Sequence, residues 1–213
     1  MGRFGETVAA LEKVFTDAPW LFEVYTRIYR SVVDREIELA GIDANDRVLN
    51  VGCGAMPFTA ALLAKRSGAT VYALDNDPSV VREARRNLAR AGVADDVEVV
   101  VGDGREVIGD GTHLPEPCSV AVVALQAEPK DEIVERYRRA QGGPSRVVVR
   151  QPRSVFSADY DPVTTAQAAQ DSAHDGGSSA GSTTSSRVIP AVPDGSVSHW
   201  MVTFGRSLLF RTD

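Results

Sequence analysis

The stretch that decides the fold is Val48-Leu49-Asn50-Val51-Gly52-Cys53-Gly54, which continues as Ala55-Met56-Pro57. Its apolar first half is typical of a buried strand, and a helix is expected to begin at Pro57, because proline is favoured in a first helical turn. Gly52 and Gly54 let the backbone turn sharply and approach a ligand with no side chain between them. A strand, a glycine turn and a helix in this order indicate a loop that meets a nucleotide-like ligand.

Short β-branched runs alternate with helical stretches on both sides of this loop. The expected strands are Val48–Val51, Thr70–Leu74, Val97–Val101, Val120–Leu125 and Arg146–Arg150, and the expected helices are Pro57–Arg66, Pro78–Ala91 and Pro129–Ala140. Two final strands are expected at Arg187–Val192 and Val197–Phe204, joined by the turn sequence Pro193-Asp194-Gly195-Ser196. The alternation predicts an α/β fold, a Rossmann-like, seven-stranded, mostly parallel sheet with helices on both faces.

The chain divides into a short cap and one large domain. Apolar residues recur at helical spacing before the sheet, with a break at Asp17-Ala18-Pro19, so residues 1–41 are expected to form a pair of helices. Residues 42–213 are expected to form the Rossmann-like domain. Within that domain, residues 164–186 are rich in Ser, Gly and Thr and offer too little apolar surface to offset ordering entropy, which predicts a flexible insertion.

Composition narrows the class of protein. No run approaches the roughly 18 apolar residues of a membrane span, and the first residues lack a signal-peptide pattern, so a cytoplasmic protein without membrane contact is expected. The net charge of −6 disfavours nucleic acid as the main partner. Cys53 and Cys118 are expected to be free thiols, and the isolated histidines His113, His174 and His199 predict no metal site. Nothing in the sequence sets the oligomeric state.

Two acidic residues follow the second expected strand. Asp75 lies 21 positions beyond Gly54, where a carboxylate can accept both hydroxyls of a ribose, and its neighbour Asn76 is expected at the same ligand. Asp77 stands before Pro78 and is expected to cap the next helix.

A third element separates the candidate cofactors. Asp103 and Gly104 belong to a Gly-Asp-Gly turn after the third expected strand, where the carboxylate can accept a hydrogen bond from an adenine amino group; a simple turn residue is the alternative. A dinucleotide fingerprint would need glycine where this chain has Pro57. The loop, the ribose carboxylate and the adenine carboxylate together favour S-adenosylmethionine over NAD, and an NAD-dependent dehydrogenase is kept as an alternative.

Residues 48–104 resemble the class I S-adenosylmethionine-dependent methyltransferase superfamily through Val51-Gly52-Cys53-Gly54, Ala73-Leu74-Asp75-Asn76-Asp77-Pro78 and Val101-Gly102-Asp103-Gly104. The resemblance implies a seven-stranded sheet with the cofactor over its carboxyl edge and Gly52, Cys53 and Gly54 at the cofactor. The chain departs from the superfamily in Asn50, usually an acidic residue, and in Met56, usually a third glycine.

A narrower resemblance explains these departures. Gly52-Cys53-Gly54-Ala55-Met56-Pro57-Phe58-Thr59 is similar to the Gly-Ser-Gly-Pro-Leu-Pro-Leu-Thr signature of nicotianamine synthases, and Leu21–Tyr25 with Glu36 is similar to an upstream block of that family. This resemblance implies transfer of 3-amino-3-carboxypropyl groups from S-adenosylmethionine to a small-molecule amine or amino-acid acceptor, with release of methylthioadenosine. The family's helical N-terminal part is longer than the one here.

The resemblance also implies catalytic roles near the N-terminus. Glu6 falls on an acidic position that could act as general base, and Tyr25 could orient the amine; a solvated helix residue and a packed ring are the respective alternatives. Arg150 and Arg153, just past the fifth expected strand, could hold a substrate carboxylate in a guanidinium fork, or be surface arginines.

The sequence leaves several functions open. The leading one is a nicotianamine synthase-like transferase, followed by a methyltransferase that releases adenosylhomocysteine, and by a cofactor-binding module without catalytic activity.

Overall fold

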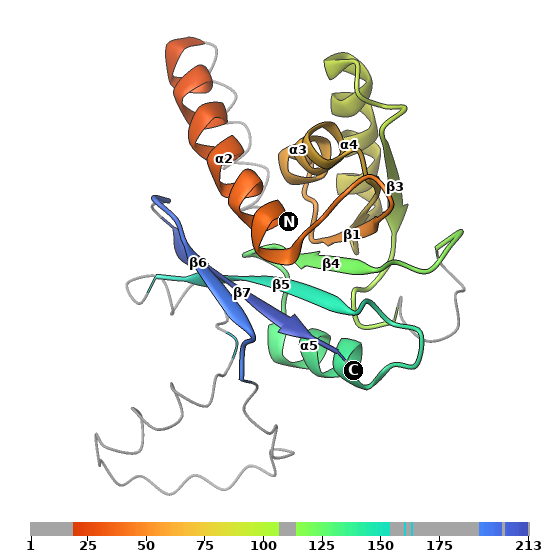
Figure 1. The fold of residues 1–213 in the computed structure, drawn as a ribbon. Helices are drawn as coiled ribbons and strands as arrows, with labels where there is room; N and C mark the ends of the chain where they lie inside the picture. The colour runs from red at the N-terminus through yellow and green to blue at the C-terminus, as the bar shows by residue number, and fades with distance from the viewer. Residues whose placement is uncertain are drawn as a thin grey trace, which may run out of the picture.

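The computed structural model describes residues 19–106, 114–153, 160, 163, 192–201 and 203–212. They form one seven-stranded sheet in the order β3-β2-β1-β4-β5-β7-β6 (Figure 1). The strands are β1 (Arg47–Val51), β2 (Thr70–Asp75), β3 (Val97–Val101), β4 (Val120–Val123), β5 (Arg146–Pro152), β6 (Gly195–Ser198) and β7 (Phe204–Arg211). Strands β1 to β5 are parallel, and β7 is antiparallel to both of its neighbours. This arrangement confirms the predicted fold class.

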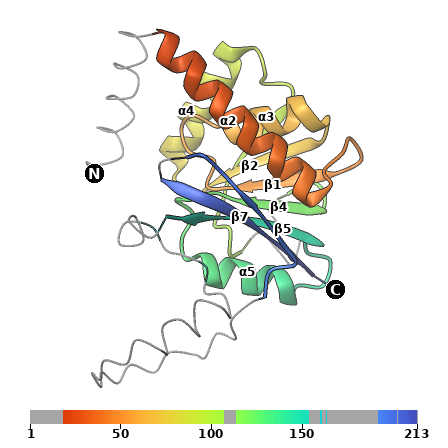
Figure 2. The same ribbon diagram turned by 60° about the vertical axis from the view of Figure 1, so that its left-hand side comes forward.

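Helices cover both faces of the sheet. They are α2 (Pro19–Ala40), α3 (Phe58–Ser67), α4 (Pro78–Ala91) and α5 (Lys130–Arg139). Figures 1 and 2 show α2, α3 and α4 on one face and α5 on the other. The two cores follow the alternation of side chains along each strand: Val48 packs with the three-helix layer, whereas Leu49 packs with α5.

The central strands are buried on both faces, which explains their continuous apolar sequences. Asn50 is the one buried polar residue of β1; its Nδ2 donates to the Val122 carbonyl oxygen of β4 at 3.1 Å. Because β1 lies where the strand order reverses, the loop that follows it opens into the crevice at the carboxyl edge, the usual ligand site of such sheets.

The two C-terminal strands differ from the prediction. The sheet uses Gly195–Ser198 and Phe204–Arg211, whereas strands were expected at 187–192 and 197–204; residues 187–191 lie outside the described part of the chain. Strand β7 lies between β5 and β6 and is covered on both faces, so Leu208, Leu209 and Phe210 are all buried. No apolar–polar alternation therefore marks this strand in the sequence.

The N-terminal segment is described only from Pro19. Helix α2 is the second member of the expected pair, and the first member would fall in residues 1–18, outside the described part. The predicted insertion at 164–186 also lies outside it. No helix within the described ranges combines the length and apolar character that crossing a membrane requires.

The burial of β7 against α5 can be tested with Phe210, which is 1% exposed. Replacement by alanine is expected to lower the free energy of unfolding by about 3–5 kcal/mol, because a large cavity opens beneath α5. Urea unfolding measures this change. The matched variant Val192→Ala, at a position 70% exposed, should leave the unfolding midpoint where it is; similar midpoints for both variants would contradict the burial.

Candidate functional site

A cavity of about 370 Å³ opens at the carboxyl ends of β1, β2 and β3. Six of the predicted cofactor residues line it: Gly52, Gly54, Asp75, Asn76, Asp103 and Gly104. They come from three loops that are separated along the chain and are brought together because parallel strands end at one edge. We call this space the nucleoside cavity.

The glycine loop and Asp75 hold each other in place. Gly52 and Gly54 adopt φ of +75° and +68°, a region that side chains disfavour. The backbone N–H of Gly54 donates to Asp75 Oδ2 at 3.0 Å, and the N–H of Asp77 donates to Asp75 Oδ1 at 3.2 Å. One hydrogen bond to each oxygen leaves the carboxylate further acceptor capacity toward the cavity that it lines.

Asp77 has the capping role predicted for it. Its Oδ1 accepts from the backbone N–H of Ser79 at 2.7 Å and from the Ser79 hydroxyl at 2.6 Å, at the start of α4. These hydrogen bonds lower the pKa of the Asp77 carboxyl. The two neighbouring aspartates therefore differ, because Asp75 is anchored to the loop and Asp77 to the helix.

Asp103 is held by Arg105, a residue that the sequence interpretation missed. Arg105 donates from its backbone N–H to Asp103 Oδ1 at 2.8 Å and from Nη2 to Oδ2 at 2.5 Å, and its Nη1 contacts Glu132 at 3.4 Å. The hydrogen bonds of Arg105 lower the pKa of the Asp103 carboxyl, which is therefore ionised and accepts hydrogen bonds. An arginine two positions after Asp103 was the sequence feature that could have indicated this contact.

Gly104 lies where the floor of the nucleoside cavity has no room for a side chain. A Cβ atom at this position would lie 2.5 Å from Val51 Cγ1. The buried Tyr137 hydroxyl of α5 donates to the Gly104 carbonyl oxygen at 2.8 Å and fixes this backbone. The nucleoside cavity therefore has a floor of bare backbone and carboxylates at two of its edges. This arrangement fits a nucleoside that carries ribose hydroxyls and an adenine amino group.

A second cavity of about 230 Å³, which we call the chamber, adjoins the first and shares Gly52, Gly54 and Gln126 with it. Most of its remaining walls are apolar or aromatic: Ala55, Met56, Phe58, Ala124, Leu125, Met201 and Phe204. Cys53 lines the chamber rather than the nucleoside cavity. Burial raises the pKa of the Cys53 thiol to about 12, so this free thiol is protonated and a poor nucleophile at neutral pH.

Arg150 lines the chamber and is engaged by protein groups. Its Nε and Nη2 donate to the two carboxylate oxygens of Glu36 at 2.9 and 2.8 Å. Its Nη1 donates to the Tyr29 hydroxyl at 2.6 Å and to the Thr59 hydroxyl at 3.0 Å. The guanidinium carbon also lies 5.2 Å from the ring centroids of Tyr29 and Phe204. The fork expected to hold a substrate carboxylate thus holds Glu36.

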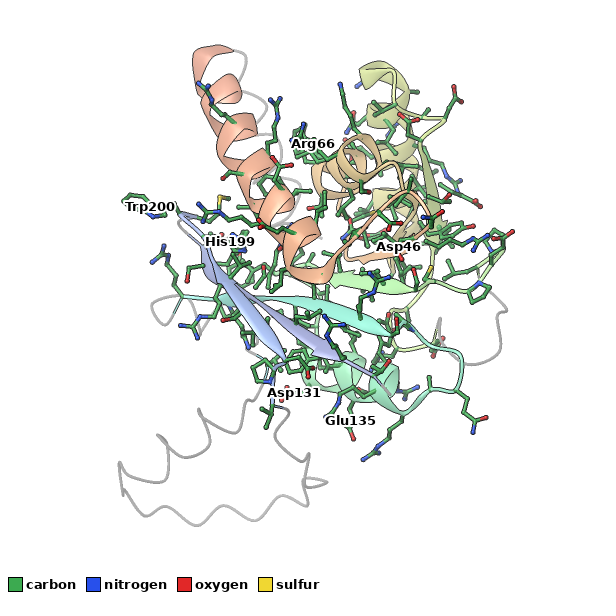
Figure 3. All side chains as sticks on the ribbon, viewed as in Figure 1. Asp46, Arg66, Asp131, Glu135, His199 and Trp200 are labelled. Carbon is green, nitrogen blue, oxygen red and sulfur yellow. The ribbon has the colours of Figure 1, made fainter. Side chains whose placement is uncertain are left out.

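A buried chain of polar groups continues behind this ion pair. The Ser207 hydroxyl donates to Glu36 Oε1 at 2.6 Å and lies 2.9 Å from His199 Nε2. Because the single Ser207 proton is used on Glu36, His199 must donate from Nε2. Figure 3 shows His199 between α2 and the β6–β7 pair, whereas its neighbour Trp200 points away from the molecule.

The charges of this cluster support one another. Burial would raise the pKa of the Glu36 carboxyl, but the charge and hydrogen bonds of Arg150 outweigh burial and hold that pKa below its ordinary value. Burial lowers the pKa of His199, and Arg150 adds to the lowering while Glu36 opposes it. The cluster therefore contains one carboxylate, one guanidinium and one neutral imidazole.

The other predicted substrate residues are placed differently. Arg153 is exposed, and it donates from Nε to the Met201 carbonyl oxygen at 2.7 Å, so it holds the β6–β7 loop that contributes Met201 to the chamber. Tyr25 belongs to α2, but its side chain is outside the described part, and so is Glu6. Their catalytic roles stay predictions. Tyr29 was not expected at the site and lies one helical turn after Tyr25 on α2. Thr59 belongs to the quoted signature, but no contact had been assigned to it.

The neutral state of His199 makes stability depend on pH. An unfolded histidine binds a proton as the pH falls below 6.5, whereas folded His199 resists it, so the free energy of unfolding is expected to fall with pH in this range. Glu36, Arg150 and Arg35 are the charged groups that act on His199. His199→Gln keeps an N–H donor for Ser207 but does not titrate, so its thermal midpoint should fall less between about pH 7.5 and 5.5. Equal slopes for variant and parent would refute the buried neutral imidazole.

Parts of this chain are similar in sequence to known proteins. A family model described as a methyltransferase domain matches residues 48–140. An L-histidine 2-aminobutanoyltransferase of Yersinia pestis is 28% identical over 139 residues, which cover 64% of this chain and 50% of that protein. A protein-L-isoaspartate O-methyltransferase of Aeropyrum pernix is 37% identical over 114 residues, which cover 53% of this chain and 42% of that protein. The chain thus spans half or less of the length of these relatives.

Solved structures share the fold at low sequence identity. MtNAS in complex with MTA and tNA superposes with a TM-score of 0.68 at 23% identity, over 96% of this chain and 68% of that chain. An RNA methyltransferase from Salinibacter ruber in complex with S-adenosyl-L-homocysteine has a TM-score of 0.56 at 21% identity, over 85% of this chain and 90% of that chain. The chain therefore has the Rossmann-like fold of class I methyltransferases, with strand order and antiparallel β7 as described above.

Proposed function

We propose that the protein is an S-adenosylmethionine-dependent transferase that moves a 3-amino-3-carboxypropyl group to an amine acceptor and releases methylthioadenosine. The observation that carries this proposal is the junction of the two cavities at Gly52, Gly54 and Gln126. A donor whose nucleoside lies in the nucleoside cavity has its sulfur near the glycine loop, so that an acceptor in the chamber can reach a carbon bound to that sulfur.

The nucleoside cavity supports the choice of donor. Asp75 offers a fixed carboxylate for the ribose and Asp103 an ionised one for the adenine amino group, while Gly104 leaves the floor open between them. The donor supplies a sulfonium, which already activates the carbon to be attacked. The protein's tasks are to align an amine behind that carbon and to accept its proton.

The chamber gives the amine of the acceptor access to the sulfonium. The amine nitrogen forms a bond to the carbon by which the 3-amino-3-carboxypropyl group is attached to sulfur, as the bond between this carbon and sulfur breaks. The electron pair of the broken bond stays on sulfur, and the amine loses one proton. Apolar walls at Met56, Phe58 and Leu125 exclude water, which would compete as a nucleophile. Glu6 is the proposed proton acceptor and Tyr25 the proposed orienting group, both from the segment that precedes Tyr29.

An amino acid is the proposed acceptor. The Yersinia pestis relative is named for transfer to L-histidine, and the MtNAS structure holds MTA, so both relatives support a group transfer of this kind. L-Histidine is therefore the first acceptor to test.

Methyl transfer is the second candidate. The methyltransferase-domain match and the relative in Aeropyrum pernix favour it. The same nucleoside cavity would serve, but the acceptor would have to reach the methyl group and the product would be adenosylhomocysteine. Binding of the donor without turnover of any acceptor would instead favour a non-catalytic module, and binding of NAD in place of the donor would favour a dehydrogenase.

The by-product distinguishes the two transfers. The protein incubated with S-adenosylmethionine and L-histidine is expected to form methylthioadenosine and an adduct of histidine that mass spectrometry detects. Heat-denatured protein is the control, because S-adenosylmethionine also releases methylthioadenosine slowly by itself. Adenosylhomocysteine without methylthioadenosine above that control would rule out the proposed reaction.

The two adjacent aspartates provide a matched test of the nucleoside cavity. Asp75→Ala is expected to weaken S-adenosylmethionine binding about tenfold or more, because a charged acceptor for the ribose is lost. Asp77 also lines the cavity, but its Oδ1 is engaged by Ser79, so Asp77→Ala should lower the thermal midpoint through the lost helix cap and change the dissociation constant less than Asp75→Ala does. Calorimetric titration measures both constants; equal losses in the two variants would contradict the assignment of Asp75 to the ribose.

A further inference from the structure

The chamber has a single charged group among the described residues that line it. That group is the guanidinium of Arg150, and the other lining residues are apolar, aromatic or neutral polar. An arginine at the end of a cavity ordinarily indicates a site for a carboxylate. The contacts of Arg150 give a different result.

Arg150 has too few unused donors for a two-point contact. A guanidinium has five N–H groups, and a carboxylate is bound in a fork by two that are parallel. Nε and Nη2 form that fork with Glu36, and Nη1 donates to the hydroxyls of Tyr29 and Thr59. These four contacts leave one N–H, on Nη2.

The charge of Arg150 is compensated as well. Glu36 is fully buried, is ionised, and lies 2.8 Å from Nη2, and it does not line the chamber. An anion in the chamber would therefore meet the attraction of Arg150 and the repulsion of Glu36 together, and would lose its hydration in an apolar space. An uncharged group loses little hydration and can still accept one hydrogen bond.

We propose that Glu36 is a specificity-determining residue of the chamber: by occupying the guanidinium of Arg150, it makes the chamber bind an uncharged part of the acceptor and reject an anionic one. This deepens the proposed function and rests on it in one respect, because it takes the chamber to be where the acceptor binds. Glu36 acts through Arg150 and does not itself line the chamber.

Acetate and acetamide test this proposal, because they have nearly the same shape and differ in charge. Saturation-transfer NMR titrations of their methyl signals give dissociation constants for the whole chain. In Glu36→Gln, which exposes the positive charge of Arg150, acetate is expected to bind about tenfold more tightly than in the parent, whereas acetamide changes little. The double variant Glu36→Gln with Arg150→Met should lose the gain. No gain of acetate in a folded Glu36→Gln overturns the proposal.

The parent protein gives a second test that needs no variant of the buried carboxylate. Here acetate is expected to bind no more tightly than acetamide, and Arg150→Met to create no difference between them. If acetate binds more tightly in the parent and loses that advantage in Arg150→Met, then Arg150 is an anion site despite Glu36 and the proposal is wrong. This comparison decides the matter if Glu36→Gln does not fold, as judged by circular dichroism.

The outcome is independent of the proposed reaction. The titrations measure binding and need neither S-adenosylmethionine nor turnover. A charge-dependent change of acetate binding without methylthioadenosine formation would retain the role of Glu36 and remove the proposed transfer. Methylthioadenosine formation without such a change would do the reverse.

Discussion

The ion pair between Glu36 and Arg150 is the contact on which the arrangement of the chamber depends. Glu36 comes from α2 and Arg150 from β5, and the guanidinium reaches Thr59 at the start of α3 and the Phe204 ring of β7. A buried pair of this kind contributes little net stability compared with apolar residues, but removal of one partner leaves an uncompensated charge and costs about 3–5 kcal/mol. The pair therefore determines how α2, α3, β5 and β7 are arranged and adds little to the stability of the fold.

The two cavities have different physical characters because they form in different ways. The nucleoside cavity is built from backbone and carboxylates at the ends of parallel strands, and each carboxylate is held by a nearby group, Asp75 by the Gly54 N–H and Asp103 by Arg105. The chamber is lined by residues of α2, α3, β5, β7 and the β6–β7 loop, beside the loops that follow β1 and β4. The nucleoside cavity thus follows from strand topology, whereas the chamber also depends on how α2 and the C-terminal strands pack against the sheet.

Local sequence was sufficient where one segment decides the outcome. The glycine loop, the capping by Asp77 and the strand at Val97–Val101 were each predicted with the position that the structure has. Sequence failed for β7, because Phe204–Arg211 contains none of the β-branched residues by which the other strands were recognised. It also missed Arg105, although the partner Asp103 is only two positions away. It gave Thr59 no contact, because Arg150 lies 91 positions further along the chain.

The sequence by itself determined the class of fold and the order of the three loops that line the nucleoside cavity, because strand period, turn glycines and helix starts are local properties that need no partner. Only the tertiary structure decided the state of Arg150. From sequence, an arginine after the fifth strand was as well suited to a substrate carboxylate as to any other anion. The fold brings Glu36 to it across 114 positions of the chain, and a guanidinium whose fork is occupied and whose charge is compensated no longer has that capacity.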